Sequence, residues 1–168
     1  MNNGCENIQG YFYSKPIPAN EMEEYLKKRD FSKTKEPKGR VAKKFERIFV
    51  VQEHHASHLH WDFRIADEGV LKSWAIPKEP KNEPNIKRLA IQTEDHPLEY
   101  ANFEGEIPEG CYGAGTVKIW DKGKYELLEK TENSYVIRLY GKKLNGKFVL
   151  RKFPKAGRNS WLFFKVKE

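Results

Sequence analysis

Short runs rich in β-branched and aromatic residues fill the chain from Phe45 onward, and turn-forming residues separate them. In several runs apolar and polar positions alternate, which is typical of a strand with one buried face. No long helical pattern lies between them, so the sequence predicts a mainly β chain whose antiparallel sheet folds on itself as a barrel or sandwich. The predicted strands are Phe49–Val51, Leu59–Arg64, Val70–Ile76, Arg88–Thr93, Gly115–Trp120, Lys124–Leu128, Ser134–Leu139, Lys147–Arg151 and Ser160–Val166.

Glycine, asparagine and aspartate mark the expected turns. Asp67–Gly69 and Asp121–Gly123 are predicted to interrupt the strands, and Asn145–Gly146 is typical of a two-residue hairpin turn. The glycines of Gly110–Gly115 favour a tight backbone turn. Their spacing does not fit a dinucleotide-binding loop, and they precede a strand where such a loop would lead into a helix.

The first 44 residues are polar and rich in lysine. They predict one short helix, Asn20–Lys28, with Asn20 as its N-cap, and an extended arm from Arg29 to Gly39. We therefore expect an N-terminal extension and arm at residues 1–44 and one domain at residues 45–168. We also expect that residues 1–28 can be deleted without loss of activity, whereas a deletion through Glu36 cannot be tolerated.

Four of the five histidines lie between positions 54 and 60. Because Leu59–Arg64 alternates apolar and polar residues, its imidazoles, carboxylate and guanidinium are predicted to project from one face of a strand. A turn just before this strand would bring His54 close to His60 and Asp62. Two histidines and one carboxylate commonly hold a divalent transition metal that must still bind substrate. The alternatives are a solvated histidine loop or a tag, but a tag lacks interleaved apolar residues.

A second polar cluster, Glu94–Tyr100, follows the Arg88 strand and is expected to be a loop. His96 in this segment, together with Arg64, Arg88 and Lys78, offers groups that clamp phosphate oxygens and stabilise negative charge in a transition state. The alternative is an ordinary charged loop at the rim of the sheet.

Composition and charge indicate which partner and which cellular compartment to expect. The 168 residues carry a formal net charge of +7, which favours an anionic partner such as nucleic acid, although charge alone fits a basic protein without one equally well. Two cysteines are too few for a disulfide framework, and the N-terminus lacks a secretory pattern, so we expect a reduced, cytoplasmic protein. No apolar run is long enough to span a membrane, and we expect no membrane partner.

Motifs from about Arg29 to Lys165 lie in the order and spacing of a known family. They are Gln52–His54, Leu59–Arg64, Leu71–Lys78, Lys87–Ala90, Glu94–Tyr100 and Phe103–Gly115. In these segments the sequence closely resembles the 3′-phosphoesterase domain family of DNA ligase D and its free-standing archaeal relatives.

The resemblance implies a small, closed or nearly closed antiparallel β-barrel with a metal-centred groove. It also implies a hydrolase acting on DNA primer-template 3′ ends: one step removes a 3′-terminal ribonucleoside and leaves a 3′-phosphate, and a second hydrolyses that phosphate to a 3′-OH. Manganese is the expected metal, with other divalent transition ions as alternatives. The resemblance assigns metal ligation to His54, His60 and Asp62, and active-site positions to Arg29, Asp30, Glu36, Gln52, Arg64, Lys78, Arg88, Glu94, His96 and Tyr100.

The chain carries no ligase or polymerase pattern, so we expect it to act alone or with separate ligase or polymerase partners. We also expect a monomer. One alternative is a non-catalytic nucleic-acid-binding β-barrel, since interleaved aromatic and basic residues also suit single-strand binding. The metal triad distinguishes the two, because a stacking platform does not need it. A cupin-like metal barrel acting on a small molecule is a further alternative, and the basic residues count against it.

Overall fold

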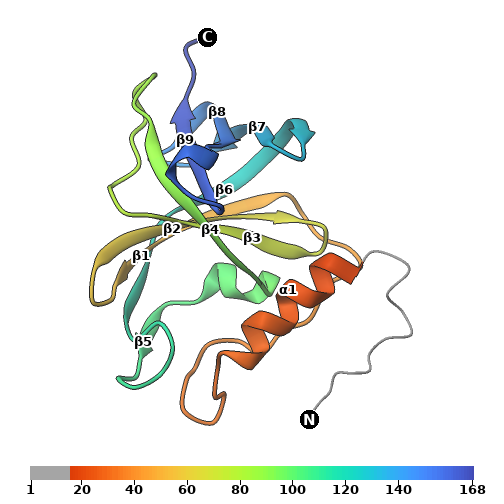
Figure 1. The fold of residues 1–168 in the computed structure, drawn as a ribbon, viewed down its shortest axis with the longest axis vertical. Coiled ribbons are helices and arrows are strands. Elements are labelled where there is room, and N and C mark those ends of the chain that lie inside the picture. Colours follow the sequence, from red (N-terminus) through yellow and green to blue (C-terminus); the bar gives the residue numbers. More distant parts are fainter. Residues whose placement is uncertain (1–15) are drawn as a thin grey trace.

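The computed structural model describes residues 16–168, whose nine strands form one sheet. Eight strands close into an antiparallel barrel in the order β1-β2-β3-β4-β9-β8-β7-β6, because β6 also pairs with β1, and β5 pairs with the first residues of β6 (Figure 1). The predicted closed β-barrel is therefore confirmed. The elements are α1 (Pro16–Lys27), β1 (Ile48–His55), β2 (Leu59–Asp67), β3 (Val70–Ile76), β4 (Arg88–His96), the 3-10 helix η2 (Leu98–Asn102), β5 (Gly105–Ile107), β6 (Gly115–Thr131), β7 (Ser134–Tyr140), β8 (Asn145–Lys152), the 3-10 helix η3 (Pro154–Ala156) and β9 (Ser160–Lys165).

The apolar residues that alternate along the strands fill the barrel interior. Trp61 and Phe63 of β2 belong to one buried cluster with Trp74 of β3 and Phe163 of β9. The ring centroids of Phe63 and Phe163 lie 4.7 Å apart. The predicted inward face of β2 is thus confirmed for Trp61 and Phe63, whereas Leu59, at the start of the strand, is exposed.

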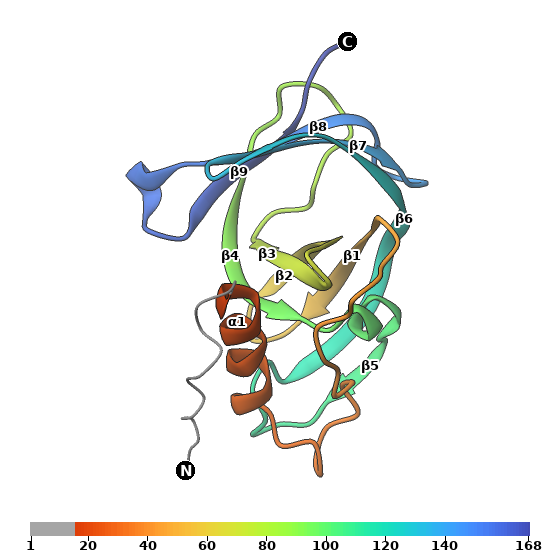
Figure 2. The same cartoon turned by 90° about the vertical axis from the view of Figure 1, so that its right-hand side faces the viewer.

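The outer face of β1, β2 and β3 is covered as well. A second buried cluster joins Met22 and Tyr25 of α1 to Val50 of β1, Leu71 of β3 and Tyr100 of η2. Figures 1 and 2 show α1 and β5 at the end of the molecule away from β7, β8 and β9. Polar side chains that project outward from β1 and β2 are therefore enclosed between the barrel and this outer layer.

The segment Asp121–Gly123 does not interrupt the chain as predicted, because β6 runs straight through it. The buried Asp121 carboxylate instead accepts hydrogen bonds of 2.8 to 3.0 Å from the backbone N–H groups of residues 142–144. It thereby builds the β7–β8 turn, and Asn145–Gly146, predicted as that turn, begins β8. The partner of Asp121 is distant in sequence, so local turn propensity could not identify it.

Two other boundaries differ from the prediction. α1 begins at Pro16, four residues before Asn20, so Asn20 does not cap it; proline is tolerated in a first turn, where no helical hydrogen bond is lost. β4 continues to His96, so Glu94–His96 belongs to a strand and not to a loop.

The tight turn at Gly110–Gly115 is confirmed, with positive φ angles at three glycines. None of the helices in residues 16–168 is long and apolar enough to cross a bilayer.

Tyr25 packs α1 against the rest of the molecule. Its side chain is fully buried, and its hydroxyl donates to the carbonyl of Pro37 in the arm. Its ring centroid lies 4.9 Å from that of His96 and 4.0 Å from the Arg29 guanidinium carbon. The expectation that residues up to 28 can be deleted conflicts with this packing, because α1 is part of the layer that encloses the outer face.

Replacing Tyr25 with alanine should lower the free energy of unfolding by about 3–5 kcal/mol, since it empties a buried aromatic site. Lys27→Ala changes an exposed residue of the same helix and should stay within about 0.5 kcal/mol of the parent. Urea unfolding followed by tryptophan fluorescence measures both variants. Equal stability of the two variants would show that α1 does not contribute to the fold.

Candidate metal centre

The β1–β2 hairpin brings the predicted metal ligands together. Its register places His54 opposite His60 and Gln52 opposite Asp62, and the chain turns between the strands at residues 56–58. His54 Nδ1 lies 3.4 Å from Asp62 Oδ2, and His60 Nε2 lies 3.3 Å from the same oxygen. One ligand atom from each residue lies within 4.8 Å of the others, so the three side chains form a possible metal-binding triad.

Backbone carbonyls orient both imidazole rings. His54 Nε2 lies 2.7 Å from the Gly113 carbonyl oxygen, and His60 Nδ1 lies 3.0 Å from that of His58. A carbonyl only accepts, so these nitrogens carry the proton in the neutral rings and the opposite nitrogens keep lone pairs toward Asp62. Metal-binding histidines are commonly held through their second nitrogen in this way. Donors bound to one ion at about 2.1 Å lie roughly 3–3.5 Å apart, so the residues fit a metal ion.

Asp62 is buried and ionised. Burial alone would raise the pKa of this carboxyl group, but Arg64 and the two histidines outweigh burial and hold the pKa well below its usual range. Burial would likewise lower the pKa of His60, but the hydrogen bond and charge of Asp62 raise it. A proton on His60 therefore competes with a metal cation for the same nitrogen.

Gln52 and Arg64 extend the polar group along the two strands. The fully buried Gln52 amide donates to the carbonyls of Tyr100 at 2.8 Å and Phe103 at 3.0 Å, and its oxygen accepts from Arg64 Nε at 2.7 Å. Arg64 Nη2 lies 3.4 Å from Asp62 Oδ2. Arg64 Nη1 is buried and has no hydrogen-bond partner among the described residues. A buried donor without an acceptor is costly, so this atom is suited to an anionic ligand.

Arg29 connects the arm to β4 at the same site. Its Nε donates to Glu36 at 2.9 Å, its Nη1 to Glu94 at 3.1 Å, and its Nη2 lies 3.3 Å from His96 Nε2. Tyr100 donates its hydroxyl to Glu36 at 2.8 Å. Burial and the nearby arginines lower the pKa of His96 well below its usual value, so the ring is neutral at pH 7. His96 Nδ1 lies 2.9 Å from the Glu94 carbonyl and therefore carries the proton, which leaves Nε2 as an acceptor.

These groups enclose one cavity of about 330 Å³ on the outer face of the barrel. It contains the three predicted metal ligands and most of the other predicted site residues, while Gln52 lies buried behind it. The lining residues are Arg29, Glu36, His54, Ala56, His60, Asp62, Arg64, Ala75, Thr93, Glu94, His96, Tyr100, Ile107, Tyr112 and Gly113.

Lys78 and Arg88 do not line this cavity. Lys78 is exposed after the end of β3. Arg88 is the first residue of β4 and lies on the same face of the strand as Ala90, which packs inside the barrel. Its Nε donates to the Glu79 carbonyl at 2.8 Å. Of the expected phosphate clamp, the structure therefore brings Arg64 and His96 to the cavity, but not Arg88 or Lys78.

Asp30 also lies away from the cavity, although its neighbour Arg29 is at the centre of the site. Its side chain is 54% exposed. Its carboxylate accepts hydrogen bonds from the hydroxyl and backbone N–H of Ser32, which stabilises a turn in the arm. The position of Asp30 in this structure is thus that of a turn residue.

Tyr112 and Thr93 line the cavity and were not among the predicted site residues. Tyr112 is 47% exposed in the glycine-rich turn before β6. Its ring centroid lies 4.8 Å from Lys28 Nζ and 5.2 Å from the Arg29 guanidinium carbon. The available sequence signal was a large aromatic residue within a turn that usually carries small and polar residues.

Comparisons with known proteins agree with this geometry. Residues 52–152 match the family model of the DNA ligase D 3′-phosphoesterase domain. The chain is 46% identical over 166 residues to the multifunctional non-homologous end joining protein LigD of Pseudomonas aeruginosa, covering 92% of this chain and 19% of that protein. It is 41% identical over 155 residues to the LigD protein of Mycobacterium tuberculosis H37Rv, covering 89% and 20% respectively. The chain thus spans about a fifth of the length of these curated relatives.

We expect the protein to bind one Mn²⁺ per chain and His60→Ala to weaken binding by at least ~100-fold, since only two ligands remain. Binding should also weaken from pH 8 to pH 6, because a proton must leave His60. Isothermal titration calorimetry measures both effects. His58→Ala is the matched control, because it removes an exposed histidine from the same hairpin. Unchanged Mn²⁺ affinity in His60→Ala would contradict the assigned site.

Proposed function

The chain belongs to the 3′-phosphoesterase family of DNA ligase D, and on that premise we propose that it is a metal-dependent hydrolase that heals DNA 3′ ends. In this proposal it removes a 3′-terminal ribonucleoside from a primer strand and then hydrolyses the remaining 3′-phosphate to a 3′-OH. Manganese is the proposed metal, because two imidazoles and one carboxylate suit transition ions better than Mg²⁺.

The unpaired Arg64 Nη1 beside the metal triad is the observation that carries this proposal. A guanidinium has donors spaced to contact two phosphate oxygens, and in this site its remaining nitrogens already bind Gln52 and Asp62. Nη1 is buried as it stands, so a shift of the Arg64 side chain toward the cavity that it lines would bring this donor to a phosphate oxygen. A phosphate group next to His54, His60 and Asp62 would accept a hydrogen bond from Arg64 Nη1 and would also bind a metal held by these three residues.

The first step requires water to attack the phosphorus atom. A P–O bond to the water oxygen forms, the P–O bond to the 5′-oxygen of the terminal ribonucleoside breaks, and a proton must reach that oxygen. A divalent ion held by the triad supplies neutralisation of the phosphoryl oxygens when bound. Arg64 adds a fixed positive charge where negative charge develops.

His96 is the group suited to move the proton. Its Nε2 accepts from Arg29 Nη2 and cannot donate, since Nδ1 carries the proton. We therefore assign it the role of base toward the attacking water. The leaving 5′-oxygen takes its proton from solvent, and the imidazolium then releases its own proton to solvent. Ser73 Oγ, 3.4 Å from Nδ1, and the Glu94 carbonyl hold the ring in this orientation.

A non-catalytic nucleic-acid-binding barrel is the second candidate. Such a module relies on exposed aromatic platforms and basic grooves. Here Arg29, Arg64, Asp62 and Glu36 are instead almost fully buried. Buried ion pairs often contribute little to stability or lower it. Their presence around the cavity is therefore better explained by catalysis than by simple binding, which favours the enzyme.

DNA is the proposed partner, and the net charge of +7 supports contact with a phosphate backbone. The relatives are named for multiple functions in end joining, and this chain corresponds to about a fifth of their length. We propose that ligase and polymerase activities complete the joining of the ends that this domain heals.

Wild-type protein with Mn²⁺ should shorten a labelled primer ending in ribonucleotides and convert a 3′-phosphate to a 3′-OH. Arg64→Ala should lower kcat/KM by about 10²–10³-fold on both substrates, the ribonucleotide-ended primer and the 3′-phosphate. This is the usual effect of losing one transition-state donor. His96→Ala should lower the single-turnover rate more than the primer affinity, because it acts on developing charge. Gel-resolved products and fluorescence anisotropy give the rates and affinities.

Arg151→Ala, an exposed arginine on β8 outside the cavity, is the matched control and should retain full activity. Tight binding of these ends by wild-type protein without turnover in Mn²⁺ would reject the enzyme and support the binding module.

A further inference from the structure

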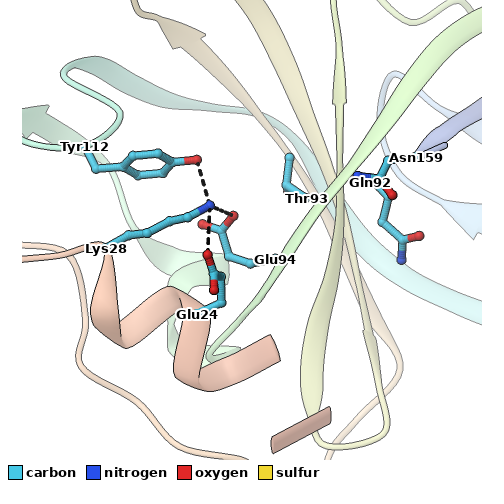
Figure 3. A pocket seen from close by; sticks show the side chains of 7 residues that line it. All are labelled: Glu24, Lys28, Gln92, Thr93, Glu94, Tyr112 and Asn159. Carbon is cyan, nitrogen blue, oxygen red and sulfur yellow. Dashed lines mark hydrogen bonds and ion pairs between the residues drawn. The ribbon is translucent and has the colours of Figure 1, made fainter. Parts of the chain in front are cut away.

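A second cavity, of about 420 Å³, lies directly beside the metal cavity (Figure 3). The two cavities share Thr93, Glu94 and Tyr112 as common walls. The second cavity is completed by Glu24 and Lys28 at the end of α1, and by Gln92 and Asn159 on the barrel side. No residue of the metal triad lines it.

Glu94 separates the two cavities with one carboxylate. Its Oε2 accepts from Arg29 Nη1 in the metal cavity at 3.1 Å, and its Oε1 accepts from Lys28 Nζ in the second cavity at 3.3 Å. Figure 3 shows Lys28 reaching between Glu24, Glu94 and the hydroxyl of Tyr112. A ligand that crosses this boundary would therefore have one part beside the metal ligands and the other beside Lys28 and Tyr112.

The charges differ between the cavities. The second cavity has two carboxylates, Glu24 and Glu94, and a single ammonium group, Lys28. These charges sum to −1, which disfavours a phosphate. The metal cavity has three carboxylates, Glu36, Asp62 and Glu94, and two guanidinium groups, Arg29 and Arg64, so a divalent cation held by the triad would give it the net positive charge that attracts a phosphate. The second cavity instead offers carboxylate, amide and hydroxyl groups and a half-exposed aromatic ring, which suit an uncharged polar ligand with an aromatic base.

We propose that the second cavity binds the terminal ribonucleoside, the leaving group of the first hydrolytic step. This inference rests on the proposed function, and it assigns a direction to the substrate: the scissile phosphate lies at the metal and the departing nucleoside toward α1. The primer strand, which is polyanionic, leaves the metal cavity away from Glu24.

A ribonucleoside fits the available hydrogen-bond groups. Its vicinal 2′- and 3′-hydroxyls are two donors at the spacing of a carboxylate, and the Glu24 side chain is 53% exposed, with Lys28 Nζ at 3.7 Å as its ion-pair partner, so it can turn toward them at little cost. The Asn159 side chain offers both a donor and an acceptor to a base edge. A 3′-phosphate end has no such nucleoside and leaves the second cavity empty.

The test compares two substrates in Mn²⁺, a primer ending in ribonucleotides and the same primer ending in a 3′-phosphate. The double variant Glu24→Gln/Asn159→Ala should lower kcat/KM about tenfold on the ribonucleoside end, mainly by raising KM, because hydrogen bonds to the leaving group are lost. Its kcat/KM on the 3′-phosphate should stay within about twofold of wild type, which also shows that the variant is folded. Glu23→Gln removes the same charge one position earlier on α1, outside the cavity, and should change neither rate.

Free adenosine gives a second measurement. At millimolar concentration it should inhibit cleavage of the ribonucleoside end by wild-type protein and leave 3′-phosphate hydrolysis unchanged, and the double variant should be less sensitive to it. Equal loss on both substrates in the double variant, or no loss on either, would overturn the subsite. A wild-type protein inactive on both ends would instead reject the proposed function.

Discussion

Two arginines enclosed between the barrel and its outer layer control the arrangement of the site. The side chains of Arg29 and Arg64 are each only 4% exposed. A buried charge without a partner costs several kcal/mol, so Glu36 of the arm, Glu94 of β4 and Asp62 of β2 must stay where they are. The arm is too polar to pack by apolar contact alone, and these ion pairs explain why it lies against the barrel.

The most local features were predictable from the sequence. The alternation in β2 separates the core residues Trp61 and Phe63 from Asp62, and a hairpin needs only a short turn to place His54 beside His60. Neither inference requires knowledge of the rest of the fold. The closed barrel needed more: many short strands indicated a barrel or sandwich, and the resemblance to the ligase D domain selected the barrel.

Features that depend on distant partners could not be predicted in this way. Asp121 has the composition of a turn residue, yet its carboxylate is buried because it organises the turn before β8. Likewise, α1 looks like a solvated helix until Tyr25 is seen against His96. The family resemblance placed Arg88 at the active site, but motif spacing does not say which face of β4 that residue occupies.

The position of His96 shows how a small irregularity decides the chemistry. Ser73 pairs with Thr93, and Leu71 pairs with His96, so β4 has one residue more than β3 between these pairs. In an uninterrupted strand His96 would share the inward face of Ala90, because the two are an even number of residues apart. The bulge shifts the alternation, so that Glu94 and His96 both reach the outer cavity. Removing Asp95 from the bulge would restore the plain alternation: His96 would still lie opposite Leu71, but Glu94, four residues from Ala90, would turn into the barrel and leave Arg29 without this partner.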